Sequence, residues 1–193
     1  RGIDDVATMY KYNIILANSD ENQMKELKVL NTLLSKQVDG LIYMGYVLSD
    51  AIRQELKRTR TPVVLAGTVD PEGMFPSVNI DYEEATYHAV KRLLETGSKQ
   101  IAFVSGPLSD PINGVYRLLG YQRALKEYHI PYDETLIYAV DPTYHAGEAL
   151  SKSLLDQCVD GIYVSDDLIA VGVLNGLTDR GVLVPERVQI ITS

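Results

Sequence analysis

The chain has 193 residues, of which 46% are hydrophobic, and its 26 acidic against 18 basic residues give a formal net charge of -8. This composition is typical of a globular protein with a sizeable core, and the acidic balance argues against nucleic-acid binding by these residues themselves, because such binding depends on clustered Lys and Arg. The one cysteine, Cys158, excludes an internal disulfide and a multi-cysteine metal site, and no run approaches the roughly 18 uncharged apolar residues of a membrane span.

Helix and strand patterns alternate through the first part of the chain. Apolar residues recur at helical spacing at the start, and short apolar runs bounded by polar turns follow it. The predicted elements are, in chain order, a helix over residues 1–9, a short strand at 13–16, a helix over 22–36, a buried strand over 38–44, a helix over 49–56 capped by Ser49, and a buried strand in "TPVVLAG" (61–67). This alternation predicts a parallel sheet covered by helices.

A second round of the same alternation begins near residue 80. Asp81 is the predicted N-cap of a helix that Gly97 ends, with Glu84 at capping-box spacing. The further predicted elements are a strand in "KQIAFVSGP" (99–107), a helix over 114–128, a strand over 135–140, a helix over 146–157, a strand over 159–164, a helix over 167–180, and a last strand in "VQIITS" (188–193).

One sequence pattern occurs twice. "LLSKQVDGLIYMG" (33–45) and "LLDQCVDGIYVSD" (154–166) share the same internal spacing of Leu-Leu, three residues, Val-Asp-Gly and an apolar run. A helix tail that leads into a buried strand therefore appears in both parts of the chain, which indicates two similar halves. We expect the boundary near Ile80 and Asp81, giving domains of residues 1–80 and 81–193.

The patterns at both ends of the chain predict that neighbouring structural elements are missing. The first helical pattern begins at Arg1 without a capping residue ahead of it, and the last strand has nothing after it to cover it. We expect the amino-terminal domain to lack its first strand and the carboxy-terminal domain to lack its final segment.

Enzyme and metal-site signatures are absent from the sequence. It contains no nucleotide-binding glycine motif, no nucleophile elbow and no zinc-protease motif. The three histidines, His88, His129 and His145, occur at unrelated spacings, which favours helix ends or solvent over metal ligation. We therefore expect neither catalysis nor a bound metal.

The segments that follow the predicted strands carry the most interesting polar residues. In open α/β sheets a ligand binds outside the carboxyl ends of the strands. The segments there are rich in small residues and short oxygen-bearing side chains, and they read "NSDEN", "MGYVLSD", "AGTVD", "SGPLSDPING", "VDPTYH" and "SDD". Arg117 follows one of them near a helix start, where its guanidinium would hold a polyol or phosphate. The alternative is an exposed helix arginine paired with a nearby carboxylate.

Four stretches of the sequence resemble one known family. They are "SVNIDYEEATYHAV", "KQIAFVSGPLSDPIN", "RLLGYQRAL" and "SDDLIAVGVLNGLTDRGVLVPERVQII", and the chain resembles the core of LacI/GalR transcriptional regulators over nearly its whole length. The resemblance implies two Rossmann-like α/β subdomains flanking a cleft, as in periplasmic sugar-binding proteins, here truncated at both ends. "RGIDDVATMYKYNIILANSDENQ" further resembles the branch of this family that controls carbon catabolite repression in Gram-positive bacteria.

The resemblance implies an effector site in the second half of the chain. Arg117 matches the family arginine that binds effector hydroxyls, Asp166 matches a cleft-edge Asn or Asp that contacts effector, and Ser109 lies in a loop that does likewise. No cofactor is implied, and a sugar phosphate is a possible effector.

The resemblance also implies protein partners. In the catabolite-control branch the trigger is the phosphocarrier HPr phosphorylated on a serine, and its docking surface includes the first helix, here Arg1, Ile3 and Asp5. Family homodimers pair through the first helix and its following strand and through the helix after Asp166, which points to the apolar residues Met9, Tyr10, Val171 and Leu174. The alternatives are a simple helix-start charge at Asp5 and burial of the apolar residues against their own core.

The resemblance therefore implies a cytoplasmic regulator that binds operator DNA through an amino-terminal helix-turn-helix domain outside this chain. Two other functions remain open: a sugar-sensing repressor of the same family, and a periplasmic-type sugar-binding transport protein.

Overall fold

The computed structural model describes residues 1–20, 22–45 and 48–193, and the chain forms two compact units, Arg1–Val78 and Asn79–Ser193. Each unit contains a parallel sheet with helices packed on it, which confirms the predicted α/β class. No helix in the described part of the chain is both long and apolar enough to span a membrane.

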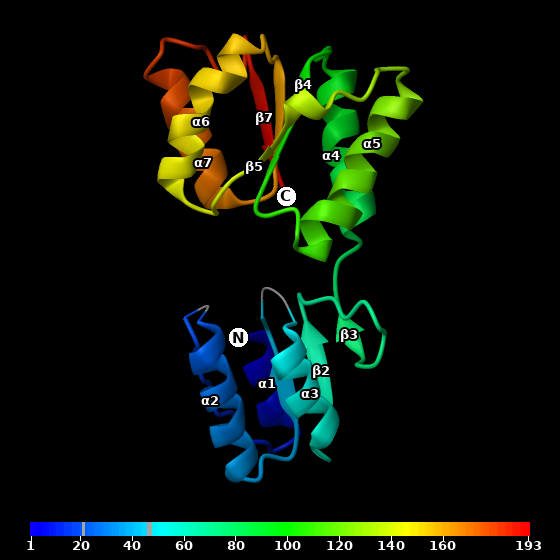
Figure 1. Ribbon diagram of the computed structural model, residues 1–193, viewed down its shortest axis with the longest axis vertical. Helices are drawn as coiled ribbons and strands as arrows, with labels where there is room; N and C mark the ends of the chain where they lie inside the picture. Colours follow the sequence, from blue (N-terminus) through cyan, green and yellow to red (C-terminus); the bar gives the residue numbers. More distant parts are fainter. Residues whose placement is uncertain (21, 46–47) are drawn as a thin grey trace. The chain divides into compact units, whose positions relative to one another are not determined.

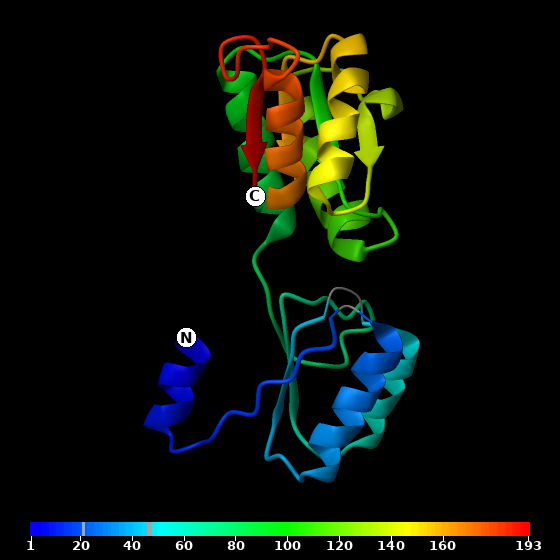
Figure 2. The same ribbon diagram turned by 90° about the vertical axis from the view of Figure 1, so that its left-hand side faces the viewer.

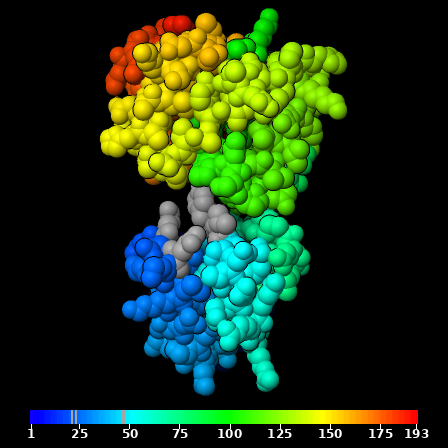
Figure 3. Space-filling model, in the orientation of Figure 1, coloured from blue at the N-terminus to red at the C-terminus, as the bar shows by residue number. Residues whose placement is uncertain are grey.

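The first unit contains a three-stranded parallel sheet in the order β1-β2-β3. Its elements are α1 (Gly2–Met9), α2 (Gln23–Ser35), β1 (Leu41–Tyr43), α3 (Asp50–Arg58), β2 (Val63–Ala66) and β3 (Ser77–Val78). Helices α2 and α3 lie on the same face of the sheet, which is turned toward the viewer in Figure 1, and the blue and cyan atoms of these parts of the chain form much of the front surface of this unit in Figure 3. The predicted cap of α3 is confirmed, because the Ser49 side chain accepts a hydrogen bond from the Ile52 backbone N–H.

A small hydrophobic core joins these two helices to the sheet. Its buried members are Leu30, Leu48, Ile52, Leu56, Val63 and Leu65. Leu48 lies just ahead of the cap of α3, and the other five side chains come from positions that the apolar spacing places on the inner face of a helix or strand. Helix α1, by contrast, has no buried residue and stands apart from the sheet in Figure 2.

The predicted strand at residues 13–16 is wrong for this structure. These residues form no strand, and Ile14, Ile15 and Leu16 are 45%, 53% and 92% exposed. An isolated strand gains little, because its backbone groups and apolar side chains need a neighbouring strand to satisfy and cover them. Within the described residues, no strand pairs with this segment.

The second unit contains a four-stranded parallel sheet in the order β5-β4-β6-β7. Its elements are α4 (Tyr82–Glu95), β4 (Ile101–Ser105), the π-helix η1 (Ile112–Arg117), α5 (Leu118–Glu127), the 3-10 helix η2 (Glu134–Leu136), β5 (Ile137–Ala139), α6 (Tyr144–Asp156), β6 (Gly161–Val164), α7 (Asp167–Thr178) and β7 (Gln189–Thr192). The predicted cap is confirmed, because the Asp81 carboxylate accepts from the Glu84 N–H at 2.9 Å.

Helices cover both faces of this second sheet. Figure 2 shows α6 and α7 in front of the strands and α4 behind them. Alternate residues of one strand enter different cores: Ala102 and Val104 pack with α6 and α7, whereas Phe103 packs with α4 and α5. The two central strands, β4 and β6, are therefore buried on both sides, which explains their continuous apolar runs.

The helix expected over residues 114–128 begins differently from the prediction. Its first turn is the π-helix η1, and α5 follows from Leu118. A Cβ at Gly114 would lie 1.8 Å from the Leu108 carbonyl oxygen, so glycine is needed for the preceding loop to approach this turn. The wide turn and the close loop together determine where the Arg117 side chain emerges.

The two copies of the Val-Asp-Gly pattern adopt matching local conformations. Gln37 and Cys158 occupy the same position in the pattern, and both have a positive φ, 57° and 53°. In the second unit the Asp160 carboxylate accepts hydrogen bonds from the Lys99 and Gln100 backbone N–H groups at 2.9–3.0 Å. The second copy therefore ties the start of β6 to the segment before β4.

Candidate functional site

The carboxyl edge of the second sheet collects the polar residues expected at the effector site. Ser109 follows β4, Arg117 ends η1 beyond that loop, and Asp166 follows β6. Because β4 and β6 are neighbouring parallel strands, the segments that follow them leave the same edge of the sheet. The structure thus places all three residues at one edge of one unit.

Arg117 is the central residue of this edge. It is only 8% exposed, so the alternative of an exposed helix arginine is wrong. Its Nη1 donates to the Tyr163 hydroxyl at 2.5 Å, to the Ser193 carbonyl at 2.6 Å and to Ser193 Oγ at 3.0 Å. The Tyr82 ring packs against the guanidinium, 5.1 Å from ring centroid to Cζ. The side chain is therefore held from one edge and one face.

The Nε atom lies on the opposite edge of the same guanidinium. It is buried and makes no hydrogen bond among the described residues. A buried N–H without an acceptor costs about 1–3 kcal/mol, more for a charged group. An oxygen-rich ligand that accepts from this nitrogen would remove that cost.

Asp110 places a carboxyl group near Arg117. It is 5% exposed and accepts from the Ile112 N–H at 3.1 Å and from Asn113 Nδ2 at 3.1 Å. Burial raises the pKa of Asp110, opposed by the Ile112 hydrogen bond and the positive charge of Arg117. The carboxylate lies within the electrostatic influence of the guanidinium but forms no ion pair with it within the described part of the chain.

The other two expected effector residues, Asp166 and Ser109, differ in how many hydrogen bonds their side chains already make within the protein. Asp166 is the N-cap of α7, and its Oδ1 accepts from the Leu168 and Ile169 N–H groups at 2.8 and 3.2 Å. This cap leaves Oδ2 for another donor. Ser109 is exposed in the turn after β4. Both residues keep a polar atom for a ligand.

In the first unit the loop after β2 is held by internal ion pairs. Asp70 is 9% exposed, lies 3.4 Å from Arg53 Nε, and accepts from the Met74 N–H at 2.8 Å. These contacts fasten the loop to α3, so Asp70 has a structural role. Three residues of the other expected loops, Glu21, Tyr46 and Val47, lie outside the described residues.

The residues expected at partner surfaces are all on helix exteriors. Arg1, Ile3 and Asp5 are exposed on or beside α1. Among the apolar residues expected at the dimer interface, Met9 is 74% exposed, Tyr10 69%, Val171 48% and Leu174 39%. The alternative that they face their own core is therefore wrong for the described structure.

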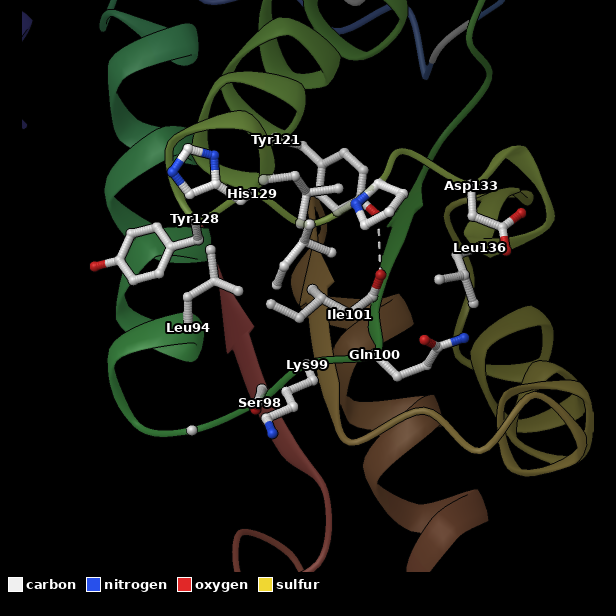
Figure 4. Close-up of a pocket in the computed structure, with 14 residues that line it drawn as sticks. Leu94, Ser98, Lys99, Gln100, Ile101, Tyr121, Tyr128, His129, Asp133 and Leu136 are labelled. Carbon is white, nitrogen blue, oxygen red and sulfur yellow. Dashed lines mark hydrogen bonds between the residues drawn. The ribbon is translucent and has the colours of Figure 1, made fainter.

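A pocket of about 550 Å³ lies at the other edge of the second sheet. Figure 4 shows it between the ends of α4 and α5 and the start of β4, with Tyr121 donating to the Ile101 carbonyl at 2.9 Å. Burial raises the pKa of the Tyr121 hydroxyl. Ile101 is the first residue of β4, so this pocket is separate from the cluster around Arg117. Within the described residues, no group of three or more His, Cys, Asp or Glu is placed to hold a metal ion.

Sequence reasoning missed several residues of the Arg117 cluster. Tyr163 lies inside an apolar strand, and nothing in its neighbours marks its hydroxyl as functional. Asp110 was detectable in principle, because an Asp just ahead of a helix start is typical of capping. The contacts of Tyr82 and Ser193 with Arg117 depend on the tertiary structure alone.

Comparisons with known proteins agree with this architecture. Residues 1–193 match the family model for periplasmic binding proteins and the sugar binding domain of the LacI family. Catabolite control protein A of Streptococcus mutans is 51% identical over 193 residues, which are 100% of this chain and 58% of that protein. This chain therefore spans less than two thirds of that relative's length.

Solved structures show the same fold. The transcription regulator CcpA of Lactococcus lactis superposes with a TM-score of 0.95 at 50% identity, over 100% of this chain and 71% of that chain. A complex of the transcriptional regulator CelR with cellobiose superposes with a TM-score of 0.88 at 31% identity, over 99% of this chain and 59% of that chain. The expected periplasmic-binding-protein-like core is confirmed.

Proposed function

This chain belongs to the family of periplasmic binding proteins and LacI-type sugar-binding domains, and we propose that it is the effector-binding and dimerisation core of a transcription regulator of the catabolite control protein A type. The observation that carries the proposal is the 51% identity to the Streptococcus mutans regulator along the whole chain. The proposed subdomains are residues 1–80 and 81–193, a boundary two residues beyond the division between the two compact units. It works in the cytoplasm and has no catalytic step.

DNA binding in this proposal comes from a helix-turn-helix domain outside the 193 residues. The chain has a net charge of -8, which opposes binding to phosphates by the core itself. The core instead controls operator affinity, because a ligand that binds one arrangement of the two subdomains better shifts the population toward it.

The proposed trigger is HPr phosphorylated on a serine, docked on α1 through Arg1, Ile3 and Asp5. Solvent exposure of all three side chains supports this surface. The test measures operator affinity of the intact protein at fixed salt with HPr and with serine-phosphorylated HPr. We expect a gain only with the phosphorylated form, reduced by Asp5→Ala. Asp4→Ala is the matched control, because it removes the neighbouring acid of the same helix. Equal affinity with both forms of HPr would contradict the proposal.

The proposed dimer pairs α1 and α7 with the same helices of a second copy. Met9 and Tyr10 at the end of α1 and Val171 and Leu174 on α7 supply exposed apolar surface for it. Burying such side chains between two copies removes apolar area from water, which favours association.

A second candidate is a small-sugar sensor of the same family, in which Arg117, Asp166 and Ser109 bind the ligand. The observation that favours it is the buried Arg117 Nε without an acceptor among the described residues. Calorimetry of the intact protein against a panel of sugars and sugar phosphates tests it. We expect binding that Arg117→Ala abolishes and that Arg123→Ala, a change of a surface arginine on α5, leaves intact. Absence of heat with every sugar would exclude this role.

A further inference from the structure

Tyr163 carries a buried hydroxyl that joins three parts of the second unit. The residue lies in β6 and its side chain is 0% exposed. Its hydroxyl lies 2.5 Å from Arg117 Nη1, 2.8 Å from Ser193 Oγ and 3.0 Å from Thr86 Oγ1. These partners come from η1, from the residue after β7 and from α4.

Packing alone does not account for a tyrosine at this position. The ring stacks on Phe103 with centroids 5.4 Å apart, inside the core cluster that α4 and α5 cover. A phenylalanine would make the same ring contact without bringing a polar atom into the core. A buried hydroxyl costs free energy unless it is hydrogen-bonded, and here the hydrogen bonds of the Tyr163 hydroxyl offset that cost.

The hydrogen-bond inventory gives the hydroxyl a defined role toward Arg117. A guanidinium has only donors, so Tyr163 accepts from Nη1 and directs its own proton to Ser193 Oγ or Thr86 Oγ1. The N–H groups of Nη1 are then shared among Tyr163 and the two oxygens of Ser193. Nη1 is thereby occupied by protein.

The occupied nitrogen determines which edge of the guanidinium is left for a ligand. Within the described residues, neither Nε nor Nη2 of Arg117 donates a hydrogen bond, and Nε is buried. The parallel N–H groups of Nε and Nη2 match two adjacent acceptor oxygens. The Tyr82 ring covers the flat face and prevents the group from tilting away.

We propose that Tyr163 is a positioning residue, whose hydroxyl anchors Arg117 Nη1 so that the Nε and Nη2 edge is presented to a ligand with two adjacent oxygen acceptors. Vicinal hydroxyls and an oxyanion share this chemistry. The inference rests on the small-ligand role proposed for Arg117. What it adds is that Tyr163 restrains the orientation of the Arg117 guanidinium.

The first arm of the test needs no ligand. Tyr163→Phe removes only the hydroxyl, and Tyr121→Phe is the matched control, because Tyr121 is equally buried in the same core and its hydroxyl binds the Ile101 carbonyl instead. Nitrogen NMR of the arginine side chains in the intact protein reports rotation of the Arg117 guanidinium. We expect rotation to become at least about tenfold faster in Tyr163→Phe, the order expected for one lost hydrogen bond to a charged group, and unchanged in Tyr121→Phe. Unchanged rotation in both variants would overturn the proposal.

The second arm measures ligand affinity by calorimetry with cellobiose and with inorganic phosphate. Cellobiose tests whether the two acceptor oxygens are vicinal hydroxyls, and phosphate tests whether they belong to an oxyanion. We expect Tyr163→Phe to weaken binding of the probe by about tenfold and Tyr121→Phe to leave it unchanged. An equal loss in both variants would assign Tyr163 a merely structural role. If neither probe binds the unaltered protein, the small-ligand role fails, while the NMR result still decides whether Tyr163 restrains Arg117.

Discussion

Replacing Asp160 by alanine should destabilise the second unit by removing the carboxylate that joins β6 to the segment before β4. Its Oδ1 accepts from the Lys99 and Gln100 N–H groups at 3.0 and 2.9 Å, and its Oδ2 accepts from Lys99 at 3.0 Å. The same residue's backbone carbonyl accepts from the Gln189 N–H, and alanine retains that bond. The substitution therefore isolates the side-chain contribution.

The expected loss is about 2–3 kcal/mol of the free energy of unfolding, since a hydrogen bond to a charged acceptor contributes about 1.5–3 kcal/mol. The two amides do not contribute equally. Lys99 is exposed, so water replaces the carboxylate there at small cost, whereas Gln100 is half-buried and its N–H is left poorly satisfied. Most of the loss is therefore assigned to the Gln100 amide.

Urea unfolding of the intact protein followed by circular dichroism gives the free energy, and hydrogen exchange of residues 97–103 gives the local effect. We expect a lower urea midpoint and faster exchange at Lys99 and Gln100. Asp156→Ala is the matched control: this exposed carboxylate at the end of α6 opposes the helix dipole, so its removal should be neutral or slightly stabilising. An unchanged midpoint in Asp160→Ala, with exchange matching the control, would refute the reasoning.

Gly172→Ala should lower the free energy of unfolding by about 3 kcal/mol or more, which urea unfolding measures. The new Cβ would lie 2.0 Å from the Tyr144 carbonyl oxygen, so α6 and α7 would have to separate. Tyr87→Phe should raise the pKa of Glu127, since the Tyr87 hydrogen bond, at 2.6 Å, is the largest cause that lowers this pKa from the ordinary value of a glutamate. The stability that this contact contributes is present above the pKa of Glu127 in the unfolded chain, and it is lost as the pH falls through the lower pKa of Glu127 in the folded protein. Titration of the Glu127 carboxyl carbon by NMR measures the folded-state pKa. Val171→Asp should increase the monomer fraction in sedimentation velocity, because it places a charge on the apolar surface proposed for the dimer, where the side chain is 48% exposed in the single chain.

Controls separate each of these effects from general damage. Gly2→Ala meets no atom within 4 Å, so the free energy of unfolding should change by less than about 0.5 kcal/mol. Thr178→Asp adds the same charge to an exposed position of α7 one turn beyond Leu174, and it should affect dimerisation less than Val171→Asp does. Equal losses in Gly2→Ala and Gly172→Ala would contradict the packing argument, and a monomer fraction unaffected by Val171→Asp would contradict the proposed interface.

The sequence by itself determined most of the alternation of helices and strands and the ends of several helices. Ser49, Asp81 and Gly97 marked helix ends correctly, because a cap is a contact between residues a few positions apart. The repeated Val-Asp-Gly pattern indicated two similar halves for the same reason: its turn geometry is local, and Gln37 and Cys158 adopt it in both.

Only the tertiary structure decided how these elements surround Arg117. The sequence left Arg117 open between an exposed ion pair and a ligand-binding group, and its burial depends on residues 46 and 76 positions away, Tyr163 and Ser193. The same limit explains the error at residues 13–16, where an apolar run predicts a strand but a strand forms only beside a partner. Periodicity and capping report interactions within a few residues, whereas a buried guanidinium and a paired strand depend on contacts between segments far apart in the chain.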